Sequence, residues 1–190
     1  MRRSVLLLVA VLTACTTAVV ETTTSAPEPT TTTESTTSTT GVSAPSETID
    51  PPVLAPDFTL ELGDGSTFVL SESDMPVYLL FWAEWCPVCR KEIPMIDNLA
   101  AEYAGSVEFV APVWKSAEEY VLVAVDELMP SGVIKWGLDI EGVIFDLYQV
   151  PYQPVTVLIN PDRTVLEAWA GVRSEERIRA SLEALAPTSR

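Results

Sequence analysis

Two cysteines separated by two residues stand between a buried strand and a helix, and this arrangement constrains the fold of the chain most strongly. The unbroken apolar run at residues 77–82 predicts a strand buried on both faces. From residue 87 to residue 104 apolar side chains recur at helical spacing, which places Cys86 and Cys89 at a helix start. Pro87 suits the first helical position, because the N–H that proline lacks would have no helical partner there. The order predicts an α/β domain with its cysteine pair at a strand-to-helix junction.

The position of this pair predicts thiol–disulfide chemistry. Unpaired backbone N–H groups and the helix dipole stabilise an anion at a helix start, so Cys86 is expected to ionise and act as the nucleophile. Cys89 lies one helical turn later, where it can attack a mixed disulfide at Cys86 and act as the resolving cysteine. A purely structural disulfide and a buried, unreactive pair stay open as alternatives.

Composition excludes several other classes of site. The chain has 190 residues, three cysteines and no histidine. A zinc site around the pair would need two more ligands, and Ser-His-Asp or Cys-His catalytic groups would each lack a member. No metal ion and no cofactor is therefore expected. The formal net charge of −16 would repel phosphate groups, so nucleic acid is not an expected partner.

The chain divides into three parts. Residues 1–15 read as an export signal, with Arg2 and Arg3 before an apolar run too short to span a bilayer. The end of this signal, Leu-Thr-Ala-Cys15, resembles the lipobox of bacterial lipoproteins, which implies a lipid anchor on Cys15; an ordinary signal peptide is the alternative. Residues 16–52 are rich in Thr, Ser, Pro and Glu and predict a disordered tether. Residues 53–190 are long enough for one folded domain.

Within this domain the pattern predicts a mixed sheet flanked by helices. A Gly-Asp-Gly turn at residues 63–65 predicts a hairpin. Pro94 is expected to kink the first helix, and Ser174 to cap the last one. Further strands are expected at residues 107–113, 155–159 and 165–170, and further helices at residues 117–129 and 139–148, although residues 143–145 would also suit a strand.

The segment Phe-Trp-Ala-Glu-Trp-Cys-Pro-Val-Cys-Arg-Lys at residues 81–91 resembles the active-site signature of the thioredoxin superfamily. Residues 55–60 and 148–159 are similar to stretches of its exported, membrane-anchored TlpA/ResA/DsbE-like branch. The resemblance implies a thioredoxin fold with an added N-terminal β-hairpin. It also implies that Pro154 is a cis-proline facing the cysteines and that Gly171 precedes the final helix.

The resemblance assigns further roles around the cysteines. The backbone of Gln153, turned by Pro154, would pair with an extended substrate, although Pro154 could instead simply begin a strand. Trp85, Pro87 and Val88 are expected to contact substrate. Leu80 occupies the position of the buried aspartate of thioredoxin. Glu84 is then the candidate for proton transfer, with a solvated surface carboxylate as the alternative.

The function implied is that of an extracytoplasmic thiol–disulfide oxidoreductase, lipid-anchored and monomeric, at the outer face of a bacterial cell membrane. By resemblance it would reduce disulfides of exported proteins or apocytochromes, and a membrane redox partner would recycle its cysteines. Three alternatives stay open. These are a disulfide-forming oxidase, a redoxin-type peroxidase and a copper-binding lipoprotein. The peroxidase usually has threonine where this chain has Ala83, and the copper carriers of this fold add a histidine.

Overall fold

The computed structural model describes residues 52–186. The predicted export signal, with Cys15, and residues 16–51 of the predicted tether lie outside the described residues. Between residues 52 and 186, no helix combines the length and the apolar character that crossing a bilayer requires.

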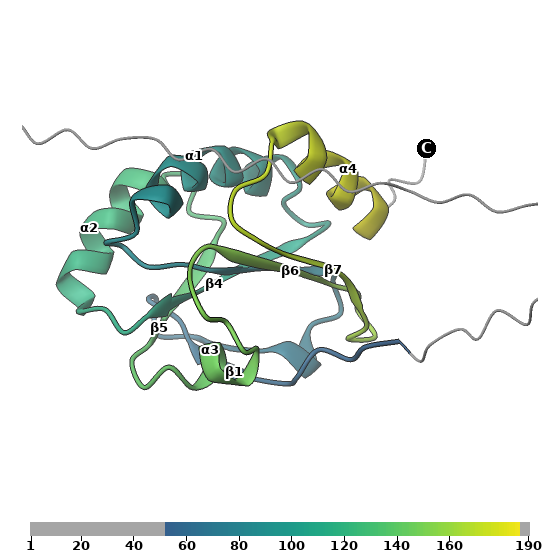
Figure 1. Cartoon of the computed structure of the whole chain (residues 1–190), viewed down its shortest axis with the longest axis horizontal. Helices are drawn as coiled ribbons and strands as arrows, with labels where there is room; N and C mark the ends of the chain where they lie inside the picture. The colour runs from purple at the N-terminus through teal and green to yellow at the C-terminus, as the bar shows by residue number, and fades with distance from the viewer. Residues whose placement is uncertain (1–51, 187–190) are drawn as a thin grey trace, which may run out of the picture. The chain divides into compact units, whose positions relative to one another are not determined.

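A five-stranded mixed sheet forms the centre of the domain, in the order β5-β4-β3-β6-β7 (Figure 1). Its middle strand, β3 (Val77–Phe81), is buried at every position, as the apolar run predicts. β3 pairs in parallel with β4 (Glu108–Trp114), which pairs in parallel with β5 (Lys135–Asp139). On its other side β3 pairs antiparallel with β6 (Val155–Ile159), and β6 pairs antiparallel with β7 (Val165–Ala170).

Side chains of β3 alternate between two cores, one on each face of the sheet. Tyr78, Leu80 and Trp82 belong to the core beneath α1 (Pro87–Glu102), α2 (Glu118–Leu128) and α4 (Glu175–Leu185). Val77, Leu79 and Phe81 belong to the core beneath the hairpin of β1 (Thr59–Glu61) and β2 (Thr67–Val69), the 3-10 turn Leu70–Glu72 and α3 (Val143–Leu147). Figure 1 shows these two layers, with α3 and β1 on the opposite side of the sheet from α1, α2 and α4. The structure confirms the mixed sheet, its flanking helices and the added hairpin.

The sequence-based prediction misses β5 and begins the following helix too early, although a helix is present within the predicted residues 139–148. It contains no strand at β5, because the sequence Lys-Trp-Gly-Leu-Asp combines polar ends with an internal glycine, both of which weaken a strand pattern. The helix expected from residue 139 begins only at Val143. Asp139 ends β5, and its carboxylate accepts the backbone N–H groups of Val143, Ile144 and Phe145 at 2.8–3.0 Å. The carboxylate thus supplies acceptors for N–H groups that a helix start leaves unpaired.

Two helix signals in the sequence stand where they were expected. Ser174 is the N-cap residue of α4, but its side chain makes no capping hydrogen bond. Pro94 lies inside α1, which continues as one helix through it. The kink expected at Pro94 stays a prediction.

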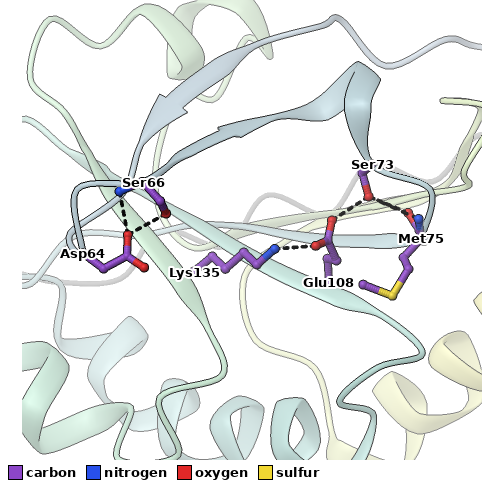
Figure 2. Close-up of polar contacts among 6 residues, drawn as sticks. All are labelled: Asp64, Ser66, Ser73, Met75, Glu108 and Lys135. Atoms are coloured by element: carbon purple, nitrogen blue, oxygen red, sulfur yellow. Dashed lines mark hydrogen bonds and ion pairs between the residues drawn. The ribbon is translucent and has the colours of Figure 1, made fainter.

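The carboxylate of Glu108 on β4 connects the loop before β3 to the edge strand β5 (Figure 2). The Ser73 hydroxyl, in the loop before β3, donates to Glu108 at 2.6 Å, and the ammonium group of Lys135 on β5 pairs with the same carboxylate. In the hairpin turn, the backbone N–H and the hydroxyl of Ser66 donate to Asp64 at 2.9 and 2.6 Å. The contacts of Glu108 thus join the loop before β3 to β5, a strand that has no strong sequence pattern of its own, whereas the Asp64–Ser66 contacts stay within the hairpin turn.

Candidate active site

Cys86 and Cys89 form a disulfide at the start of α1, with their Cα atoms 5.3 Å apart. Cys86 is the N-cap residue, and Pro87 takes the first helical position, as the sequence predicts. The backbone N–H of Cys89 donates to Cys86 Sγ at 3.1 Å. When the disulfide is reduced, an N–H donor and the helix dipole at this sulfur stabilise a thiolate.

The two sulfurs differ in access. Cys86 retains 5 % of its surface and Cys89 none, so an attacking or accepting partner can reach only the first cysteine. Trp82 is fully buried, and its backbone continues β3 through a bridge to Val113 of β4. The sheet therefore holds the chain as far as Trp82, and three residues separate Trp82 from Cys86.

The loop that leads into β6 forms the wall opposite the disulfide. The Gln153–Pro154 peptide bond is cis, as the resemblance implies. The carbonyl oxygen of Gln153 lies 4.0 Å from Cys86 Sγ. The carbonyl of Pro154 accepts the backbone N–H of Gly171 at 2.8 Å, which attaches this wall to the end of β7. Segments distant in sequence thereby meet at Cys86.

Exposed apolar side chains lie on these same segments, close in sequence to the residues that form the site. Trp85 is 56 % exposed and Val88 45 %, which places both expected substrate-contacting residues on the surface beside Cys86, and Pro87 is exposed between them. Tyr152 and Val172, 56 % and 54 % exposed, flank Gln153 and Gly171. Sequence reasoning missed Tyr152 and Val172, because only the tertiary fold brings their loops to the cysteines. We call Trp85, Val88, Tyr152 and Val172 the apolar rim.

Glu84 is not a freely solvated carboxylate. It is half-buried, and its carboxylate accepts a hydrogen bond from the hydroxyl of Ser116, a buried residue between β4 and α2. Its backbone carbonyl accepts a hydrogen bond from the Arg90 guanidinium at 3.3 Å. Leu80, at the position where thioredoxin has its buried acid, is 2 % exposed in the core. These contacts tie the loop before Cys86 to α1 and to the loop before α2.

A buried acid that sequence reasoning missed lies one helical turn after Cys89. Glu92 is 3 % exposed, and its carboxylate accepts the backbone N–H of Arg173 at 3.2 Å. Burial raises the pKa of Glu92. The sequence did contain an indication that Glu92 is buried. Glu92 lies on the same face of the helix as Cys89 and Ile96, both of which are fully buried. A buried acid with a raised pKa beside a redox pair has the properties of a proton-transfer group.

Replacing Glu92 with glutamine is expected to stabilise the protein at pH 8 and to leave its stability nearly unchanged at pH 4. The folded-state pKa of Glu92 exceeds its unfolded value, so its stabilising contribution is complete below the unfolded pKa and is lost as pH rises through the folded pKa. Each unit of that difference is worth about 1.4 kcal/mol. Urea unfolding of both proteins at the two pH values measures the effect.

Glu102→Gln on the same helix is the matched control. The Arg179 guanidinium holds the pKa of the exposed Glu102 below its usual range, so this variant should lose, rather than gain, stability at pH 8. Equal responses of the two variants to pH would contradict the assignment.

Comparisons with known proteins agree with this geometry. The AhpC/TSA family model matches residues 53–169. Thiol-disulfide oxidoreductase ResA of Bacillus subtilis (strain 168) is 31% identical over 150 residues, which cover 77% of this chain and 82% of ResA. A structure described as a thiol:disulfide interchange protein DsbE from Chlorobium tepidum superposes with a TM-score of 0.65 at 28% identity, covering 72% of this chain and 98% of that one.

An exposed lipoprotein thioredoxin, Etrx1 of Streptococcus pneumoniae strain TIGR4, gives a TM-score of 0.60 at 25% identity, covering 68% of this chain and all of that one. The fold, the cysteine pair and these similarities lead to one assignment. The chain belongs to the AhpC/TSA family and is a thioredoxin-fold thiol-disulfide oxidoreductase of the ResA and DsbE type, with Cys86 and Cys89 as its cysteine pair.

Proposed function

We propose that the protein is an extracytoplasmic disulfide reductase for exported proteins, apocytochromes among them. The observation that carries the proposal is the disulfide at the start of α1, whose more accessible sulfur lies 4.0 Å from the Gln153 carbonyl oxygen, with the exposed apolar rim on the same segments. An extended polypeptide can lie along the Gln153 backbone and place its own disulfide against Cys86.

The reaction transfers two electrons from the reduced cysteine pair to the substrate. The Cys86 thiolate attacks one sulfur of the substrate disulfide, forming a mixed disulfide and releasing the other substrate sulfur as a thiolate. Cys89 then loses its proton and attacks Cys86 Sγ, which closes the enzyme disulfide and releases the second substrate sulfur as a thiolate that takes up a proton from water. Glu92, buried one turn after Cys89, is our candidate for accepting that proton. A membrane redox partner would return the Cys86–Cys89 disulfide to the dithiol.

The direction of electron transfer is tested by the reduction potential of the pair, measured against glutathione. We expect a potential at or below that of thioredoxin, about −270 mV, as befits a reductant. A value near about −120 mV, that of a strong oxidant, would reverse the assignment to a disulfide-forming oxidase. The name of the ResA relative and the described DsbE structure support thiol–disulfide exchange in either direction.

The extracytoplasmic, lipid-anchored location rests on the lipobox-like end of the export signal and on the likeness to an exposed lipoprotein thioredoxin. Cys15→Ala, expressed in a bacterium that processes lipoproteins, should move the protein from the membrane fraction to the soluble exported fraction, because two acyl chains give stable anchoring. Cys89→Ser, which leaves Cys15 in place, is the control and should stay in the membrane fraction. Membrane retention of the Cys15→Ala protein would disprove the anchor.

A further inference from the structure

Arg90 connects the active-site loop to an acid on a different helix. Its backbone N–H donates to the Cys86 carbonyl at 3.1 Å, in the first turn of α1. One terminal nitrogen of its guanidinium donates to the Glu84 carbonyl at 3.3 Å, and the other terminal nitrogen pairs with the carboxylate of Glu127 on α2. The cation is thus held between the loop that precedes Cys86 and the last turn of α2.

The neighbouring cation is placed differently. Lys91 is exposed, whereas the Arg90 side chain retains only 35 % of its surface. Glu127 is 59 % exposed, so its ion pair with Arg90 contributes little to stability. An ion pair that hardly stabilises the fold can still change the charge that acts on a nearby sulfur.

We infer that Arg90 and Glu127 together set the reduction potential of the Cys86–Cys89 couple: Arg90 raises it, and Glu127 reduces the effect of Arg90. Only the reduced state carries a thiolate at Cys86, so a nearby cation stabilises that state relative to the disulfide. An anion paired with the cation weakens this stabilisation. Both are positioning residues, since neither contacts the sulfur that reacts.

The inference rests on the proposed role of Cys86 as the nucleophile. The Arg90–Glu127 ion pair could affect the couple in two ways, and these have different consequences. If the pair only braces the loop, removing either partner breaks the same contact and both variants change in the same direction. If the pair acts through charge, removing Arg90 and removing Glu127 produce opposite shifts. In the double variant these shifts partly cancel.

The test is the equilibrium of each protein with a glutathione buffer at pH 8.5, where a thiol with an ordinary pKa of about 8.5 is substantially ionised. Arg90→Gln should make the couple more reducing. The equilibrium constant for its oxidation should rise about threefold, which corresponds to a reduction potential about 14 mV lower. Glu127→Gln should lower that constant about twofold, and Arg90→Gln/Glu127→Gln should fall between the two single variants. Circular dichroism of each variant checks that it folds.

Lys91→Gln is the matched control, because it removes the same charge from an exposed position one residue away from Arg90. It should shift the equilibrium clearly less than Arg90→Gln. In 1 M salt, where the screening length is about 3 Å, the difference between Glu127→Gln and wild type should shrink.

Shifts of the two single variants in the same direction, or an Arg90→Gln shift no larger than that of Lys91→Gln, would overturn the inference. Its failure is distinguishable from failure of the proposed function, because insulin reduction by the wild-type protein is measured separately. A wild-type protein that reduces insulin, with variants that share its potential, would reject only the role of Arg90 and Glu127.

Discussion

Replacing Cys86 with serine is expected to slow insulin disulfide reduction by about 10³-fold or more, an effect of the size seen when an enzyme loses its nucleophile. The serine hydroxyl fits the same place at the start of α1 but does not ionise near neutral pH, so no mixed disulfide forms. The measurement is the rate of insulin precipitation driven by a dithiol. Full activity of Cys86→Ser would contradict the mechanism.

Cys89→Ser separates the two steps. In this variant Cys86 can still attack a substrate disulfide, but nothing resolves the product, so a mixed disulfide should accumulate. Non-reducing electrophoresis and mass spectrometry detect this species. In the Cys86→Ser protein the remaining Cys89 is fully buried and should trap far less substrate. Equal trapping by both variants would mean that the order of the two cysteines is wrong.

The second large effect is expected from the edge strand. Gly137→Ala should lower the free energy of unfolding by about 3 kcal/mol, as overpacking at a rigid contact does. A Cβ on residue 137 would lie 2.2 Å from the backbone oxygen of Glu61 and 2.8 Å from the Leu60 side chain. The backbone oxygen belongs to β1 and cannot move without displacing the hairpin from the sheet. Chemical denaturation of both proteins measures the loss.

Gly105→Ala is the matched control for this variant. Gly105 has φ +81° and open space around its added Cβ, so alanine there costs backbone strain without a clash, about 1 kcal/mol. A Gly137→Ala protein no less stable than the Gly105→Ala protein would contradict this prediction. It would show that the hairpin can move away from β5 at little cost in free energy.

The chemistry of the site could be predicted from the sequence because it is encoded locally. The strand, the cysteine pair, Pro87 and the helix follow one another in the chain, and the apolar run of β3 is unambiguous. Pro154 could be placed only through resemblance, since nothing in its own neighbourhood points to Cys86. The structure then shows the two segments in contact, with the Gln153 carbonyl 4.0 Å from Cys86 Sγ.

The rest depends on contacts between distant residues. β5 is a strand because β4 pairs with it and the hairpin covers it, although its own sequence favours a strand weakly. The burial of Glu92 is completed by the backbone of Arg173, far along the chain. Arg90 looks like an ordinary helix-surface cation until α2 brings Glu127 to it. Periodicity reports which face a residue occupies, but not which other element lies against that face.

The arrangement of the site also fixes when, during synthesis, it becomes complete. Cys86 and Gln153 are 67 positions apart, and the wall that contains Gln153 is attached to the sheet through Gly171. A growing chain that has only just passed α1 therefore carries both cysteines without the Gln153 backbone that would select their partner. We expect selective exchange to begin only when β7 has joined the sheet.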